Sequence, residues 1–208
     1  MRIDQNLNLV LPVRTDEDGN GTAFAVHTPI SREVFEANFR LLSLAKTELF
    51  SKGNAHAFGN GPTIAALTVR DEGLRDAEER GEEDGKKRIE ALFSEIRRLT
   101  LIVGPAKEGY VSLPVDAALS SGLLESEEWE DAESALVFFT LVFALSKRAR
   151  WSQAKEGCAS ILGGKMASLN ATEYAASLRT STGESPSPGV AASSETGSPT
   201  SRAPSFPT

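Results

Sequence analysis

The sequence predicts an α+β protein that is mainly α-helical, with a short N-terminal β-hairpin packed on a helical bundle and a disordered C-terminal tail. Three observations predict this class. β-prone residues flank an Asp/Asn/Gly turn near the N-terminus, and apolar residues then recur at helical spacing. After residue 179 the composition changes to Ser, Thr, Pro, Gly and Ala, which cannot bury enough apolar surface to fold. We therefore expect a domain over residues 1–179 and a disordered tail over residues 180–208.

The hairpin is predicted from two β-prone runs and the turn between them. Residues 1–13 are rich in Ile, Leu and Val, and Thr22–His27 forms the second run. Between them, Asp16–Gly21 has strong turn chemistry. An isolated hairpin is only marginally stable, so this one must pack on the helices or add to a partner's sheet.

The first predicted helix follows the hairpin. Ser31 suits its N-cap, and Gly53 follows its predicted end near Lys52. Apolar residues at helical spacing form one stripe along it: Phe35, Phe39, Leu42 and Leu49.

The middle of the chain predicts less regular structure. Ala55–Gly61 is a Gly/Asn-rich loop, and Pro62 suits the first turn of a new helix. Residues 71–87 are nearly all charged, which predicts a flexible linker or a solvated helical face. Apolar spacing then predicts a helix from Lys87 that ends before Gly104–Pro105.

A later helix is apolar on all sides. Ser126 is its expected N-cap, and Lys147–Arg148 its expected end. A helix of this kind must be buried all round, either as the central helix of the domain or partly as an interface in a homo-oligomer. Its apolar block includes Val137, Phe138, Leu141 and Val142.

Composition and charge limit the function classes. A surplus of 29 Asp and Glu over 22 Lys and Arg gives a net charge of −7, which argues against general nucleic-acid binding. The N-terminus lacks the apolar region of a signal peptide, and the longest apolar run, residues 135–145, is shorter than the roughly 20 residues of a membrane span. We expect neither nucleic acid nor membrane as a partner.

No catalytic or metal-binding pattern emerges from the sequence. His27, His56 and the lone Cys158 lack metal-ligand spacing, and a single cysteine suits a reducing compartment. Gly59–Pro62 lacks the Gly-Lys-Ser/Thr ending of a phosphate-binding loop. We therefore expect no metal, no cofactor and no enzymatic activity, and an interaction protein is the remaining class.

Met1–Val13 and Val26–Phe35, together with Ser168–Tyr174, Ser177–Leu178 and Thr180–Thr182, resemble the corresponding parts of tail assembly chaperones of long-tailed bacteriophages. The resemblance covers roughly residues 1–50 and 125–182. It implies a non-enzymatic protein of the host cytoplasm that coats the tape-measure protein before the tail tube polymerises, and that is not expected in the mature virion.

The resemblance also implies a short form and a frameshift-extended long form that share an N-terminal domain, the extension recruiting tail tube subunits. Either form is compatible with this sequence. The candidate surfaces for the tape-measure protein are the two apolar sets named above, and ordinary core is the competing interpretation for both. Two other function classes stay open: a virion structural protein, such as a minor tail or head–tail connector component, and a small regulatory or nucleic-acid-binding protein.

Overall fold

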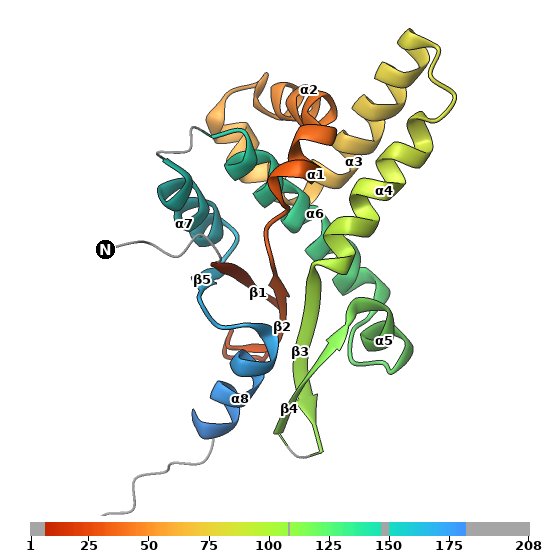
Figure 1. Ribbon diagram of the computed structural model, residues 1–208. Helices are drawn as coiled ribbons and strands as arrows, with labels where there is room; N and C mark the ends of the chain where they lie inside the picture. Colours follow the sequence, from red (N-terminus) through yellow and green to blue (C-terminus); the bar gives the residue numbers. More distant parts are fainter. Residues whose placement is uncertain (1–6, 108, 147–149, 182–208) are drawn as a thin grey trace, which may run out of the picture.

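A computed structural model describes residues 7–107, 109–146 and 150–181 (Figure 1). The described chain contains one antiparallel sheet with the strand order β4-β3-β2-β1-β5. Its strands are β1 (Asn8–Thr15), β2 (Gly21–His27), β3 (Thr100–Ala106), β4 (Gly109–Pro114) and β5 (Lys165–Ala167). The helices are α1 (Arg32–Ala37), α2 (Phe39–Phe50), α3 (Asn54–Arg80), α4 (Gly85–Arg98), α5 (Val115–Ser120), α6 (Ser126–Ala144), α7 (Trp151–Ile161) and α8 (Ala171–Ser181).

The predicted fold class is confirmed: the chain is α+β and mainly helical, and β1 and β2 form the predicted N-terminal hairpin. The turn is closed by Asp16, whose Oδ1 accepts hydrogen bonds from the backbone N–H groups of Asp18 and Asn20. Most of the tail predicted over residues 180–208 lies outside the described residues, as does the expected end of the apolar helix at Lys147–Arg148.

The apolar side chains of the strands contribute to two layers, one on each face of the sheet, because successive side chains of a strand point to opposite faces. Val10, Val26 and Val103 face α8, where they pack with Tyr174 and its neighbours. Leu9, Leu11, Ala25 and Ile102 face the main core, which the other helices complete. In Figure 1 helices α2, α3 and α4 gather at one end of the sheet and α8 lies toward the other.

Helix α6 is the central helix of the described chain. It contacts β1 and the helices α2, α3, α4 and α7, and its side chains Leu136, Phe138, Phe139 and Leu141 are fully buried. Its N-cap is Glu125 and not Ser126: the Glu125 side chain accepts from the third helical N–H, and the Glu128 carboxylate accepts from the Glu125 N–H at 2.9 Å.

The largest correction concerns α3, which replaces the predicted loop at residues 55–61 and continues to Arg80. Of the two alternatives for residues 71–87, the helical face agrees with most of the segment and the linker does not, although Glu72 and Asp76 on this helix are buried. Small residues explain this continuous helix. A Cβ on Gly61 would lie 2.4 Å from the Phe138 ring, and one on Gly73 would lie 2.7 Å from the Ile89 side chain. These glycines allow close helix packing and do not mark turns, and Pro62 lies inside the helix.

Two further corrections concern the helix boundaries and a missed strand. The predicted helix after Ser31 is divided at Asn38, whose side-chain amide donates to the Val34 carbonyl oxygen at 2.9 Å and ends α1. Ser31 caps α1 as predicted, because its Oγ accepts from the Val34 N–H. The helix predicted to end before Gly104–Pro105 ends at Arg98, and β3 follows it as a strand that was not predicted. Gly104–Pro105 lies within β3, where Pro105 pairs with Tyr110 near the end of the strand.

Candidate partner-binding groove

The eight side chains predicted to bind a partner divide into two groups. Leu42, Leu49, Val137, Phe138 and Leu141 are buried in the main core. Phe35 and Val142 are partly buried against that core, and Phe39 is 53% exposed. Ordinary core packing, the competing interpretation, therefore describes five of the eight positions, whereas Phe35 and Phe39 lie beside an open groove.

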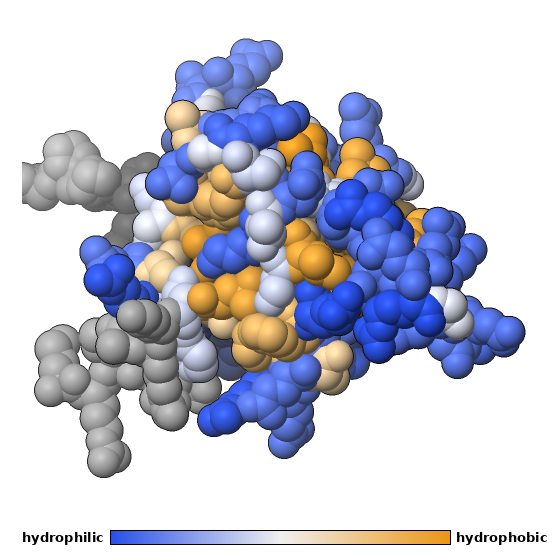
Figure 2. Space-filling model, turned by 90° about the horizontal axis from the view of Figure 1, so that it is seen from above, coloured by the Kyte–Doolittle hydropathy of each residue, from blue (hydrophilic) through white to orange (hydrophobic). Residues whose placement is uncertain are grey.

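The groove lies between the start of the α1–α2 pair and the junction of α6 with α7, and its volume is about 880 Å³. Figure 2 shows apolar surface at the helical end of the molecule, ringed by hydrophilic residues. The lining consists of Thr28, Pro29, Ile30, Ser31, Arg32, Phe35, Glu36, Phe39, Phe143, Ala144, Leu145, Ser146, Trp151 and Lys155.

One wall of the groove is fixed by the α1 cap and the break at Asn38. Phe35 and Phe39 are four residues apart and meet edge to face, with ring centroids 5.8 Å apart. Arg32 and Glu36 form an ion pair on the same short helix, with 2.6 Å between Nε and Oε1. This wall therefore presents two aromatic rings beside a neutralised pair of charges.

The opposite wall comes from the end of α6 and the start of α7. The Trp151 indole N–H donates to the Ser146 carbonyl oxygen at 2.8 Å, which connects the first residue of α7 to a residue just beyond the end of α6. The Lys155 ammonium lies 5.3 Å from the centroid of the Phe143 ring. Burial lowers the pKa of Lys155 because the apolar surroundings disfavour its charged form.

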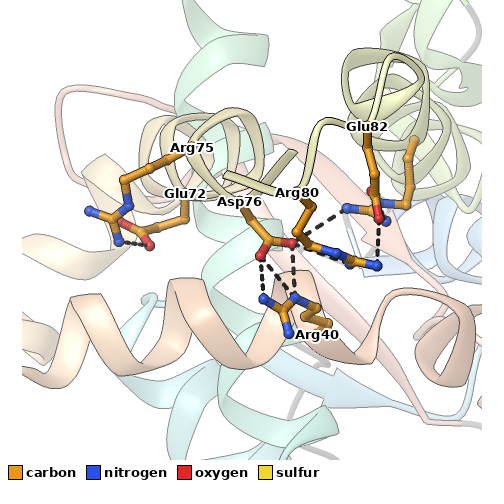
Figure 3. Close-up of polar contacts among 7 residues, drawn as sticks. Arg40, Glu72, Arg75, Asp76, Arg80 and Glu82 are labelled. Atoms are coloured by element: carbon orange, nitrogen blue, oxygen red, sulfur yellow. Dashed lines mark hydrogen bonds and ion pairs between the residues drawn. The ribbon is translucent and has the colours of Figure 1, made fainter. Parts of the chain in front are cut away.

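An ion-pair network around the buried Asp76 carboxylate connects α2 to α3 next to the groove (Figure 3). Arg40, the neighbour of Phe39, donates from Nε and Nη2 to the Asp76 carboxylate of α3, with the shortest contact at 2.5 Å. Arg80 of α3 and Arg88 of α4 add longer contacts to the same carboxylate. Hydrogen bonding to Arg40 holds the pKa of Asp76 below its ordinary value.

A second buried carboxylate on α3 behaves differently. Glu72 pairs with Arg75, also shown in Figure 3, yet burial raises the pKa of Glu72 above its ordinary value. The two acids therefore have opposite effects on folding. The Asp76 charge stabilises the contact between α2 and α3, whereas desolvation of the Glu72 charge costs free energy.

Among the residues that the structure describes, no group of three or more His, Cys, Asp and Glu side chains could hold a metal ion. Burial raises the pKa of the Cys158 thiol to about 12, so it is a poor nucleophile. Among the described helices, none has the length and apolar character to cross a bilayer.

Sequence reasoning missed Ile30, Phe143, Trp151 and Lys155 as groove residues. Two local signals could have drawn attention to them: an apolar residue directly before an N-cap, and a tryptophan just after a long apolar helix. No family model, curated protein or solved structure matches the chain.

Proposed function

We propose that this chain is a tail assembly chaperone of a long-tailed bacteriophage, a non-enzymatic protein that binds the tape-measure protein in the host cytoplasm. One observation carries the proposal. The segment Val26–Phe35, which resembles those chaperones, supplies six lining residues of the groove: Thr28, Pro29, Ile30, Ser31, Arg32 and Phe35. The resemblance and the open apolar surface thus coincide.

The physical demands of that role fit such a groove. A long helical protein exposes apolar stripes until a tube encloses it, and grooves lined by aromatic side chains cover stripes of this kind. Many chaperone copies along one partner give high avidity from individually weak contacts. In this proposal the tail over residues 180–208 recruits tail tube subunits, and the chaperone leaves before the virion is complete.

Co-expression with the tape-measure protein tests the proposal. We expect the tape-measure protein to stay soluble and to co-purify with this chain, and to aggregate when it is expressed alone. Mass spectrometry of purified virions is the second measurement, and it should find the tape-measure protein without this chain. Failure to co-purify would contradict the proposal, and retention in virions would favour a minor tail or connector component.

A further inference from the structure

We infer that two copies of this chain associate through the open edge of β4, which pairs antiparallel with β4 of the second copy about a two-fold axis at Ser112. The inference is independent of the proposed function and adds an interaction surface outside the groove. Three features support it: the backbone groups that this edge presents, the protection of the opposite end of the sheet, and the symmetry of β4 about Ser112.

β4 is the last strand of the sheet and pairs with β3 along one edge (Figure 1). The phase of the hydrogen bonds follows from the Thr28 N–H, which donates to the Leu99 carbonyl oxygen at 2.9 Å beside the β2–β3 pair. Hydrogen-bonded and non-hydrogen-bonded pairs alternate along antiparallel strands, so the backbone groups of Val103, four residues beyond Leu99, also point to β2. Its partner in β4 is Ser112, which therefore directs its N–H and C=O away from β3, to the open edge.

The open edge of β4 is regular and uncharged. Within the described residues no strand pairs with it. All six residues of β4 pair with β3 without a register shift, so the strand has no bulge. From Gly109 to Pro114 the strand carries no charged side chain. An exposed edge of this kind is prone to pair with another strand.

The opposite end of the sheet is protected against such pairing. β5 is three residues long and covers only Asn8–Val10 of β1. Beyond β5, Pro12 has no N–H to donate, and register shifts on both sides of Arg14 disrupt the ladder with β2. Arg14 also places a charge at this edge, where it pairs with Glu128 of α6. Because β4 has no such protection before its last residue, Pro114, we place the interface at β4.

The edge of β4 is complementary to itself. With the two-fold axis between the two Ser112 residues, each Ser112 N–H donates to the carbonyl oxygen of Ser112 of the second copy. The small serine side chain avoids a clash with its own copy across the axis. The same register places Val111 opposite Leu113 of the second copy, and both side chains are half-buried and apolar, so they gain contact area.

Charge and closure favour a second copy as the occupant. The whole chain carries a net charge of −7, so two copies repel each other over much of their surface, whereas their β4 strands are uncharged. A two-fold pair also closes, because each copy covers the open edge of the other and leaves no β4 edge for a third. One strand pair buries less surface than a standard interface, so we expect a dissociation constant on the order of 10–100 μM.

Sedimentation equilibrium of the full chain, at concentrations that bracket this value, tests the inference. We expect a monomer–dimer equilibrium for the wild type. Ser112→Pro removes the donor at the axis without removing a bond to β3, and should weaken dimerisation by about tenfold or more. Circular dichroism and thermal denaturation verify that the variant is folded. A monomeric wild type, or a folded Ser112→Pro variant that dimerises as tightly as the wild type, would overturn the inference.

A cysteine at the axis tests the register and does not depend on the proline variant. Opposite residues of a hydrogen-bonded pair have Cα atoms about 5.5 Å apart, within the range of a disulfide. Oxidised Ser112→Cys should therefore form a disulfide-linked dimer. The matched control is Ser94→Cys, at an exposed serine of α4, which should stay largely monomeric. The native Cys158 is buried and should not crosslink.

Two outcomes of the cysteine experiment would contradict the inference. Equal yields of linked dimer from Ser112→Cys and Ser94→Cys would show that the two β4 strands do not meet. Linkage of Ser112→Cys to a different protein, when it is oxidised in the cells that express it, would assign the edge to that protein in place of a second copy.

Discussion

His27 is a fully buried histidine whose environment favours the neutral ring. Its Nδ1 lies 2.9 Å from the Thr100 hydroxyl oxygen, and that hydroxyl donates to the Ile96 carbonyl oxygen at 2.7 Å. The hydroxyl hydrogen is thus engaged, so Nδ1–H of His27 is the donor to Thr100. Burial lowers the pKa of His27 to about 3.

This lowered pKa predicts a loss of stability in mild acid. In the unfolded chain His27 takes up a proton near pH 6.5, whereas in the folded chain it does not. The contribution of the neutral His27 to the free energy of unfolding is therefore complete above pH 6.5 and is lost as the pH falls toward 3. Between pH 7 and pH 5 the loss from His27 should be about 2 kcal/mol. Urea denaturation at both pH values should show a clearly smaller loss for His27→Gln than for the wild type.

Gly61 gives a prediction about helix packing, with a control on the same helix. Gly61→Ala places a methyl group against the Phe138 ring and should lower the free energy of unfolding by about 1–3 kcal/mol. Gly59 is exposed and has no neighbour near an added Cβ, so Gly59→Ala should raise stability by about 0.5–1 kcal/mol. Equal effects of the two substitutions in urea denaturation would contradict the packing argument.

At the scale of elements, Asp76 joins three helices. Asp76→Asn removes the acceptor charge for Arg40, Arg80 and Arg88, and should cost about 1–3 kcal/mol at pH 7. Because the pKa of Asp76 is lowered in the folded state, its contribution is present above pH 4 and disappears as the pH falls below that value.

Urea denaturation between pH 7 and pH 3 measures this effect. The difference in stability between wild type and Asp76→Asn should shrink below pH 4. Asp71→Asn, at an exposed position on the same helix, should behave like the wild type at each pH. A difference that stays constant with pH would show that the ion pairs do not stabilise the fold.

The sequence predicted those elements that neighbouring residues determine, and it failed for those that depend on contacts distant in the chain. The hairpin and the Ser31 cap follow from neighbouring residues, so the sequence predicted them. Helix α3 is different because Gly61 and Gly73 are placed by contacts with Phe138 and Ile89, which are far away in the chain. The glycines at residues 59 and 61 favour a loop locally, whereas tertiary packing made this segment helical.

At the scale of the whole molecule, the groove could be predicted only in part. Phe35 and Phe39 belong to a stripe that the sequence shows, but the same stripe includes Leu42 and Leu49, which are core residues. Helical periodicity identifies an apolar face and does not say which part of that face another element covers. The opposite wall, with Trp151 and Lys155, is brought to this stripe only by the tertiary fold.

The proposed function gives the groove and the tail separate roles, and this division leads to a further prediction. A chain that ends at Ser181 keeps every described element, including the groove. It should bind the tape-measure protein within about twofold of the full chain, because the tail composition offers little apolar surface for that contact. Co-sedimentation with tail tube subunits should be lost. A truncated chain that still recruits those subunits would contradict this division of roles.

The position of β5 has a consequence for synthesis on the ribosome. β1 is made long before β5, yet one of its edges pairs with residues 165–167. Until those residues are made, that edge of the nascent chain is open to strands of other molecules. A translation product that ends before residue 165 would therefore lack the strand that covers this edge of β1.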